Sequence, residues 1–215
     1  MLREKLSKYN IILASKSPRR QQFLKDLDVP FTIELKEVEE IYPKELQGTE
    51  ITDYLADLKA QPFDNLATND LLITSDTIVW LEGTALGKPK DTADAFRILQ
   101  ALAGKQHQVI TSVSLKSKEF QVVFNDTTKV NFKELTVDEI AYYIENHQPF
   151  DKAGSYGIQE WIGYVGIEKI EGSFYNVMGL PTQMLYEELL KFEIREDSGA
   201  LVIAYAEWQI LKAGA

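Results

Sequence analysis

The 215-residue sequence contains no cysteine and only two histidines. Without cysteine, neither disulfide bonds nor cysteine-ligated zinc sites can form, so we expect a reducing compartment, with the cytoplasm as the default. His107 and His147 alone give the usual nucleophile arrangements little to draw on. The sequence also lacks a Gly-x-Ser-x-Gly elbow and a phosphate-binding P-loop. Any chemistry must therefore rest on other residue types.

Long apolar segments and a basic surplus are lacking as well. No stretch is apolar enough to span a bilayer, and residues 1–6 mix acids with bases, so we expect neither a membrane segment nor a signal peptide. The net charge of -10 argues against a general binder of nucleic acid or anionic membranes. A local cluster of Arg and Lys on such an acidic protein would suit a small polyanion.

The residues that are present predict an α/β fold. Hydrophobic residues make up 45% of the chain, which is enough for a sizeable core, and there is no internal repeat, low-complexity tract or linker. Strand and helix patterns alternate along the chain. We expect strands over residues 11–13, 29–35, 71–80, 108–115, 120–133 and 165–170. We expect helices over residues 21–27, 50–60, 92–103, 136–146 and 181–192. Thr49 and Thr136 are candidate helix caps.

The strand-to-helix turn at residues 13–20, Leu-Ala-Ser-Lys-Ser-Pro-Arg-Arg, is the first candidate site. Ser17 is a good N-cap and Pro18 suits the first helical position, so the helix should begin with free backbone N–H groups that face an anion. Arg19 and Arg20 add guanidinium groups that can bind phosphate oxygens with paired hydrogen bonds. Taken alone, the turn is better explained as the start of a surface helix with two solvated arginines.

Asp76 is the second candidate, because it lies within the otherwise apolar strand pattern of residues 71–80. A buried carboxylate is costly unless it is hydrogen-bonded, paired or bound to metal. A structural ion pair is the alternative role for this residue. Glu40 lies in an acidic loop typical of solvated charge, and Lys59 and Lys88 would each singly be taken as surface lysines. Together these oxygen ligands and cations suit a magnesium-phosphate site, and hence phosphoryl chemistry.

Five motifs together resemble the Maf family of nucleoside triphosphate pyrophosphatases, and both their order and their spacing match over about residues 10 to 192. They are Leu-Ala-Ser-x-Ser-Pro-Arg-Arg at 13–20, Ser-Asp-Thr-Ile-Val at 75–79, Gly-Lys-Pro at 87–89, Asp-Lys-Ala-Gly-Ser-Tyr-Gly-Ile-Gln at 151–159, and Gly-Ser-Phe-Tyr-Asn-Val-Met-Gly-Leu-Pro at 172–181.

The resemblance implies one catalytic domain over residues 1–192, with two lobes around a cleft and a mixed, twisted central sheet flanked by helices, related to inosine triphosphatases and often dimeric. It also implies hydrolysis of a nucleoside triphosphate to the monophosphate and pyrophosphate with a divalent metal, Mg²⁺ or alternatively Mn²⁺. The residues implied as catalytic are Asp76, Glu40, Lys59 and Lys88, with Asp76 and Glu40 also holding the metal. Those implied to bind substrate are Ser15, Arg19, Arg20, Thr77 and Gln159.

Thr77 and Gln159 are similar to the residues of the dTTP/UTP branch of that family. A glutamine amide offers both a donor and an acceptor, which can meet the carbonyl and N3–H of uracil or thymine. Two departures from the family pattern are Glu39, where Asp is common, and Glu160, where Gly often follows the glutamine. A pyrophosphatase for a modified purine or pyrimidine nucleotide, and a nucleotide-binding regulator of cell division without turnover, remain open alternatives.

The C-terminal segment, residues 193–215, is an extension of unknown role. Its apolar run at residues 201–206, followed by Trp208, Ile210 and Leu211, needs a partner. We expect it to pack on the body of the protein or on another subunit, and a cloning or reading-frame remnant is an equally open explanation.

Overall fold

The computed structural model describes residues 2–197 and 200–205. Its helices are α1 (Leu2–Leu6), α2 (Pro18–Asp26), α3 (Thr49–Ala60), α4 (Thr92–Leu102), α5 (Val137–His147), the short 3₁₀ helix η1 (Ala153–Ser155), α6 (Trp161–Gly166), α7 (Phe174–Val177) and α8 (Thr182–Leu190). Its strands are β1 (Asn10–Leu13), β2 (Thr32–Ile33), β3 (Asp70–Leu81), β4 (Thr84–Leu86), β5 (Gln106–Lys116), β6 (Gln121–Phe132), β7 (Ile167–Glu171), β8 (Phe192–Asp197) and β9 (Ala200–Tyr205).

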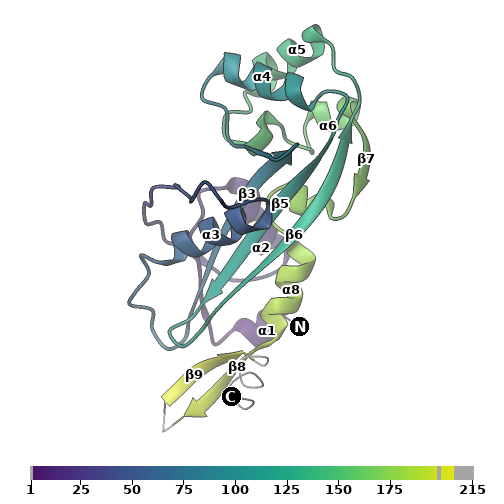
Figure 1. Ribbon diagram of the computed structural model, residues 1–215. Coiled ribbons are helices and arrows are strands. Elements are labelled where there is room, and N and C mark those ends of the chain that lie inside the picture. The colour runs from purple at the N-terminus through teal and green to yellow at the C-terminus, as the bar shows by residue number, and fades with distance from the viewer. Residues whose placement is uncertain (1, 198–199, 206–215) are drawn as a thin grey trace.

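A seven-stranded mixed sheet organises the fold, with the strand order β2-β1-β3-β5-β6-β7 and β4 paired to β3. Strand β1 runs parallel to both β2 and β3, whereas β5, β6 and β7 follow in antiparallel pairs. The three long strands β3, β5 and β6 run through most of the molecule (Figure 1). They therefore carry residues into both ends of the structure.

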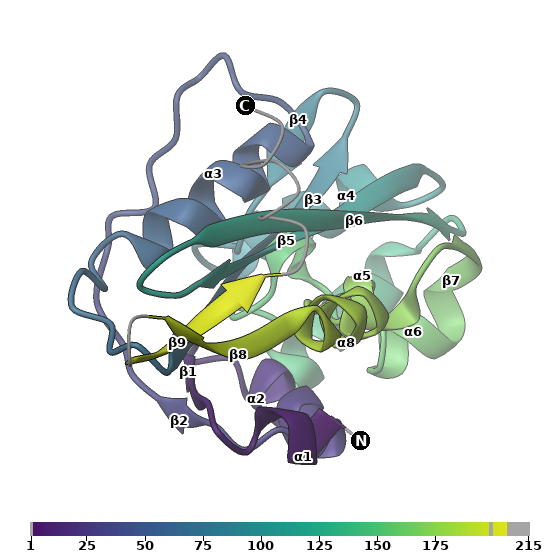
Figure 2. The same ribbon diagram turned by 90° about the horizontal axis from the view of Figure 1, so that it is seen from below.

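Helices cover both faces of the lower part of this sheet. Helix α3 lies on one face, while α1, α2 and α8 lie on the other (Figure 2). Leu24 of α2 and Leu185 and Leu189 of α8 are fully buried against Leu71 and Ile73 of β3. On the opposite face, Ile51 and Leu55 of α3 pack against Ile78 and Ile110. Burial on both faces explains why β3 is apolar on either side of its polar segment at residues 74–77.

A second hydrophobic core lies at the upper end of the sheet. There α4 and α5 pack together with the 3₁₀ helix and α6 around the far ends of the long strands (Figure 1). Val79 of β3 belongs to this upper core, whereas Ile73 of the same strand belongs to the lower one. The predicted α/β fold with two lobes and a mixed central sheet is thus confirmed.

Several elements match their predictions closely. The strand predicted at 71–80 is β3, and the two predicted strands that follow form the β5–β6 hairpin. The side chain of Thr136 caps α5 in a capping box with Glu139, as its sequence indicates. Ser17 caps α2 by accepting a hydrogen bond from the Arg20 amide, and Pro18 is the first residue of that helix.

Three predictions need correction. The strand predicted over 29–35 shrinks to the two exposed residues of β2 at the edge of the sheet, while Val29 and Phe31 before it pack on the lower core outside any strand. Thr49 is the first residue of α3 and not its cap, which is Gly48 at a φ of 52°. The strand predicted over 165–170 begins two residues late, because residues 161–166 form α6.

The C-terminal extension folds back on the lower lobe. Strands β8 and β9 form a separate antiparallel hairpin. Phe192 and Tyr205 are buried in the lower core, and the Tyr205 ring stacks on Phe120 with centroids 5.8 Å apart. The expectation that the extension packs on the body is therefore met at Tyr205. Trp208, Ile210 and Leu211 lie outside the described residues.

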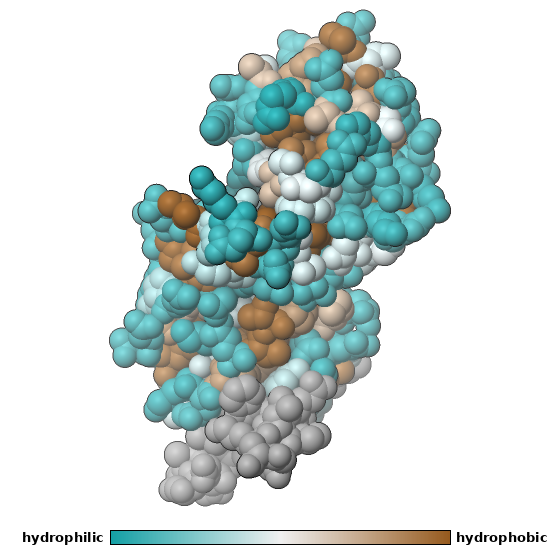
Figure 3. All heavy atoms as spheres, in the orientation of Figure 1, coloured by the Kyte–Doolittle hydropathy of each residue, from teal (hydrophilic) through white to brown (hydrophobic). Residues whose placement is uncertain are grey.

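The surface of the molecule is mainly hydrophilic. Hydrophilic side chains cover most of the face shown in Figure 3, and hydrophobic ones form separate patches. Within residues 2–197 and 200–205, no helix combines the length and the apolar character needed to cross a bilayer.

Candidate active site

The candidate site lies where β1 and β3 part. The two strands pair in parallel only as far as Leu13 and Ile73, after which the chain leaves β1 toward α2 while β3 continues. A cleft of about 550 Å³ opens beside this free edge of β3. All nine residues predicted from sequence line it: Ser15, Arg19, Arg20, Glu40, Lys59, Asp76, Thr77, Lys88 and Gln159.

The lining of the cleft is basic although the protein as a whole is acidic. Seven lysines and arginines line it against four aspartates and glutamates, on a chain with a net charge of -10. A concave surface that concentrates one sign of charge attracts small ions of the opposite sign. The arrangement therefore suits a compact polyanion such as a triphosphate.

Asp76 and Glu40 face the same lysine. The ammonium group of Lys59, which α3 supplies from its last turn, lies 2.6 Å from Oδ1 of Asp76 and 3.1 Å from Oε1 of Glu40. Asp76 is only 7% exposed, so this partner offsets much of the cost of burying its charge. The ion pair is the structural role that the sequence left open for Asp76, and its position in the cleft makes the same carboxylate available to a ligand.

These two carboxylates are also the oxygen donors that a divalent metal would need. Within the described part of the chain, no group of three or more His, Cys, Asp or Glu side chains is placed to hold a metal ion. Magnesium is commonly bound by only one or two carboxylates, with substrate phosphates and water completing its shell. The donor set thus fits a magnesium ion that binds together with a nucleoside triphosphate, and does not fit an all-protein metal cage.

The two arginines of the turn have different surroundings. Arg20 donates to the carbonyl of Gly179 at 2.8 Å, to the carbonyl of Ser75 at 3.0 Å and to the hydroxyl of Thr77 at 3.0 Å. Burial lowers the pKa of Arg20 to about 10, against the opposing effect of nearby Asp76. Arg20 therefore stays charged at neutral pH and ties α2 to β3 and to the turn before α8.

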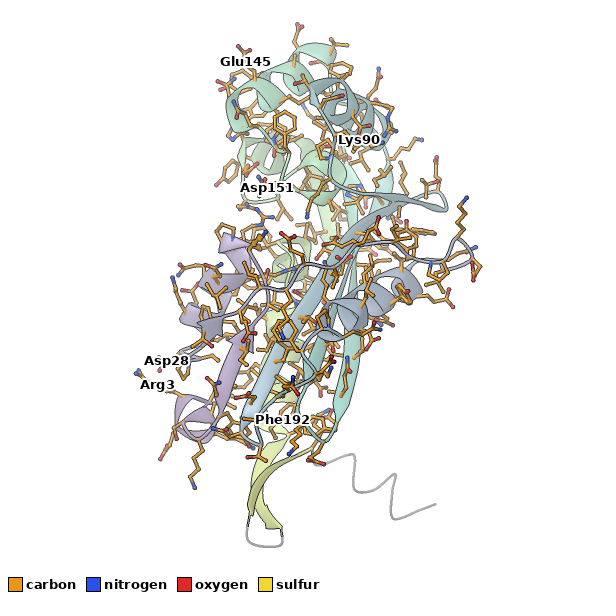
Figure 4. The ribbon with its side chains drawn as sticks, turned by 90° about the vertical axis from the view of Figure 1, so that its left-hand side faces the viewer. Arg3, Asp28, Lys90, Glu145, Asp151 and Phe192 are labelled. Carbon is orange, nitrogen blue, oxygen red and sulfur yellow. The ribbon has the colours of Figure 1, made fainter. Side chains whose placement is uncertain are left out.

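Arg19 is bound mainly by one carboxylate. Its Nη1 lies 3.0 Å from Oδ2 of Asp151, and its Nε donates to the carbonyl of Met178 at 3.3 Å. The side chain of Asp151 is 56% exposed, and Figure 4 shows it where the upper lobe meets the lower one. A solvated carboxylate of this kind is readily exchanged for phosphate oxygens. Arg19 is thus the arginine better placed to take up a ligand.

Ser15, Thr77 and Lys88 also line the cleft. The Ser15 hydroxyl accepts the Ser17 amide at 3.2 Å, which shapes the turn. The Thr77 hydroxyl is engaged by Arg20 and lies 2.9 Å from that of Thr111. Lys88 is exposed and, among the described residues, has no ion-pair partner. Of these three side chains, Lys88 is the one most available to a ligand.

The opposite wall comes from residues 151–159 in the upper lobe. The amide of Gly154 donates to the carbonyl of Gly87 at 3.0 Å, so this wall is joined to the turn that carries Lys88. A Cβ atom on Gly154 would lie 2.5 Å from Val79, and its φ of 70° also disfavours other residues. The Gln159 Oε1 atom is buried and, within the described structure, has no hydrogen-bond partner. It is an acceptor that a bound base could satisfy.

Sequence reasoning left Asp151 and Lys152 without a role, although both lie in one of the five motifs. Both line the cleft, and they contact each other at 2.6 Å. Asp-Lys at the start of the motif was the available signal, but charged residues beside each other in sequence are usually solvated. Only the position of Arg19, more than a hundred residues earlier, shows what Asp151 contacts.

The chain is similar to known proteins over the segment that contains the five motifs. A family model described as Maf-like protein matches residues 10–192. The chain is 57% identical over 190 residues to a dTTP/UTP pyrophosphatase of Flavobacterium johnsoniae, covering 88% of this chain and 98% of the relative. It is 59% identical over 191 residues to a dTTP/UTP pyrophosphatase of Flavobacterium psychrophilum, with the same two shares.

Among solved structures, a HAM1 protein from Coxiella burnetii is similar over 85% of this chain and 98% of that one, at 16% identity and a TM-score of 0.47.

Proposed function

The chain belongs to the Maf-like protein family, and from this premise we propose that it hydrolyses dTTP and UTP to the nucleoside monophosphate and pyrophosphate. The observation that carries the proposal is the convergence of all nine residues implied by the resemblance, from distant parts of the chain, on one basic cleft. The names of the two Flavobacterium relatives, which share more than half of their residues with this chain, support the same substrates.

Binding of the triphosphate rests on the basic side of the cleft. Arg19 exchanges Asp151 for phosphate oxygens, and Lys88 adds a second cation from the opposite side. Guanidinium groups suit this task because their paired donors match two phosphate oxygens at once. Arg20 adds positive charge to the cleft, and its three contacts with the protein hold the turn at residues 13–20 in place.

Hydrolysis requires a water molecule to attack the α-phosphorus. In the proposed mechanism Asp76 accepts the proton of that water as its oxygen bonds to phosphorus, while the bond from the α-phosphorus to the bridging oxygen breaks and pyrophosphate leaves. Arg19, Lys59 and Lys88 stabilise the negative charge that develops on the leaving group. Such transfers depend mainly on positioning and charge stabilisation. Glu40 shares Lys59 with Asp76 and is the alternative base.

Asp76 and Glu40 would also hold the divalent metal, for which we propose Mg²⁺, with Mn²⁺ as the alternative. When bound, such an ion neutralises phosphate charge and polarises the phosphoryl oxygens. A first test is pyrophosphate release from dTTP with and without EDTA: release should stop on chelation and return on addition of Mg²⁺. Undiminished release of pyrophosphate in EDTA would contradict the metal requirement but not the proposed hydrolysis.

Base selection is assigned to Gln159. Its free Oε1 can accept the N3–H of thymine or uracil, and its amide nitrogen can donate to a neighbouring carbonyl of the base. Cytosine carries an acceptor at N3 and would leave the same oxygen unpaired. A site that hydrogen-bonds its substrate in this way discriminates strongly against the analogue that lacks the partner.

The experiment that tests the proposed function is pyrophosphate release across canonical and modified nucleoside triphosphates. We expect dTTP and UTP to be the best substrates and dCTP to be poor. Faster turnover of a modified purine nucleotide would favour the alternative pyrophosphatase, and tight nucleotide binding without release under any divalent metal would favour the regulator of cell division.

We further propose that the protein acts in the cytoplasm as a homodimer, on a free nucleotide, and without nucleic acid or membrane as a partner. The acidic net charge supports the last two points, since basic residues concentrate in the cleft. Light scattering on the purified protein would test the dimer, and a mass equal to one 24.5 kDa chain would contradict it.

A further inference from the structure

Lys152 is a buried cation that the proposed mechanism does not use. It is only 8% exposed, and its ammonium group lies 2.6 Å from Oδ1 of Asp151 and 3.0 Å from Oε1 of Glu160. A lysine is almost never buried to this degree without a pairing partner, because desolvation of its charge is costly. Here one ammonium group is shared by two carboxylates: Asp151 lines the cleft, and Glu160 lies beside Gly157, which also lines it.

The first carboxylate leads to the phosphate side. Asp151 binds Lys152 through one oxygen and Arg19 through the other, at 3.0 Å. Burial raises the pKa of Asp151, but the hydrogen bonds from Lys152 and Arg19 outweigh it, and the pKa lies below its usual value. Asp151 is therefore an ionised bridge between the buried lysine of the upper lobe and the phosphate-binding arginine of α2.

The second carboxylate leads to the base side. Glu160 forms an ion pair with Lys152 and accepts a hydrogen bond from the hydroxyl of Tyr143, and that hydroxyl accepts the amide of Gly157 at 2.9 Å. A Cβ atom on Gly157 would lie 2.8 Å from Cδ of Glu160. Glu160 thus lies against the backbone of Gly157, two residues before Gln159, and it is one of the two positions at which the sequence departs from the family pattern.

We propose that Lys152 is a positioning residue that couples phosphate binding by Arg19 to base selection by Gln159. The inference rests on the proposed function. Without the ammonium group, Asp151 would face only Arg19 and hold it more strongly, away from phosphate oxygens. Glu160 would be left as a poorly compensated buried carboxylate and would turn toward water, releasing the segment that carries Gln159.

Because Lys152 contacts both Asp151 and Glu160, the proposal can be distinguished from a purely structural role. A lysine that only stabilises the fold would, when replaced, reduce turnover of all nucleotides by the same factor. A positioning residue would change the ratio of dTTP to dCTP turnover, and would do so separately from the affinity for a phosphate chain that carries no base.

The test compares Lys152→Met with the parent protein and with Lys133→Met. Lys133 is the matched control, since it pairs with Glu139 at 2.7 Å outside the cleft. We would measure kcat and KM for dTTP and dCTP, and the binding of inorganic tripolyphosphate by calorimetry. We expect Lys152→Met to lower the dTTP-to-dCTP ratio of kcat/KM by about ten- to a hundredfold, mainly through KM, and to weaken tripolyphosphate binding. Lys133→Met should leave both unchanged.

Further variants separate the effect of Lys152 on phosphate binding, through Asp151, from its effect on base selection, through Glu160. Adding Asp151→Asn to Lys152→Met should restore tripolyphosphate binding, because Arg19 is released, but should not restore base selectivity. If Lys152→Met fails to fold by thermal unfolding, Lys152→Gln replaces it. Its amide can still donate a hydrogen bond but carries no charge to compensate Glu160, so the same loss of selectivity is expected. A folded variant of either kind that keeps the parent ratio within twofold would overturn the proposal.

Failure of the proposed function has a different signature. A parent protein that binds dTTP but releases no pyrophosphate would overturn the activity alone, and the ratio would then be measured as dissociation constants for dTTP and dCTP. A parent protein that binds dTTP and dCTP equally would overturn the role of Lys152 in base selection.

Discussion

The ammonium group of Lys59 lies 2.6 Å from Oδ1 of Asp76, across the boundary between α3 and β3. Seventeen positions separate the two residues in sequence. The contact holds the buried carboxylate at the free edge of β3, where the cleft opens. The carboxylate that forms the ion pair is therefore also the proposed catalytic group, and substitutions at Asp76 must be interpreted with both roles in mind.

Asp76→Asn should abolish pyrophosphate release from dTTP while the protein still folds. Loss of a general base typically costs about a hundredfold to ten thousandfold in rate. The asparagine oxygen can still accept a hydrogen bond from Lys59. We therefore expect the free energy of unfolding to fall by only about 1 kcal/mol, which lowers Tm by a few degrees. Asp53→Asn is the control, because Asp53 bonds Ser112 and Asn125 outside the cleft. Near-normal turnover of Asp76→Asn would refute its assignment.

Arg19→Ala and Arg20→Ala should fail in different ways. Removing Arg20 leaves the carbonyls of Ser75 and Gly179 without their donor, so we expect unfolding free energy to fall by about 2–4 kcal/mol. Removing Arg19 should change it by less than about 1 kcal/mol, because its main partner is well exposed. We expect Arg19→Ala nevertheless to lower dTTP turnover about tenfold or more. Urea unfolding and pyrophosphate release measure the two effects, and equal stability loss in both variants would contradict this division of roles.

Arg20→Lys sharpens the same comparison. A lysine cannot replace a planar guanidinium that reaches three separate acceptors. We therefore expect this variant to recover little of the stability lost in Arg20→Ala. Full recovery would mean that charge alone, and not the fork geometry, holds the turn.

His107 should make the fold sensitive to acid. Its ring is buried, its Nε2 lies 2.8 Å from the hydroxyl of Tyr156, and burial lowers its pKa to about 4. The unfolded value is about 6.5, so below that pH the unfolded chain takes up a proton that the native one does not. The neutral, buried His107 therefore contributes to the free energy of unfolding, and this contribution is complete above pH 6.5. It is lost as the pH falls toward 4, and the total loss is about 3 kcal/mol.

The measurement is urea unfolding between pH 7 and pH 4. His107→Gln should remove this part of the pH dependence, although it also reduces stability at pH 7, and His147→Gln should retain it because His107 is still present. An unchanged slope in His107→Gln would show that other groups account for the acid sensitivity.

Tyr205 should matter for stability although it follows the segment that matches the family. Its ring is 6% exposed and packs on Phe120 and Phe192. We expect Tyr205→Ala to reduce the unfolding free energy by about 2–4 kcal/mol without changing KM for dTTP. Tyr164→Ala is the control, because Tyr164 is 81% exposed, and should change it by less than about 0.5 kcal/mol. If Tyr205→Ala were equally harmless, the hairpin would not be part of the folded body. The division of the chain at residue 192 stays a prediction.

Much of the architecture could be predicted from sequence because the signals are local. Ser17 and Pro18 indicate the start of α2, the apolar run around Asp76 indicates a buried strand, and Thr136 with Glu139 indicates the start of α5. Such signals act between residues a few positions apart, where backbone geometry alone decides the contact. The prediction failed at β2, whose apolar alternation is matched by no buried face.

Nine members of the cleft could also be predicted from the sequence, since the resemblance to the family named nine residues that the fold brings together. How those residues divide the work was decided only by tertiary structure. Arg20 and Arg19 are neighbours in sequence, yet Arg20 donates to Gly179, 159 positions away, and Arg19 pairs with Asp151, 132 positions away. The position of Lys152 between Asp151 and Glu160 is likewise a product of packing. Contacts at such separations depend on how the sheet aligns distant segments, and no local pattern encodes which donor meets which acceptor.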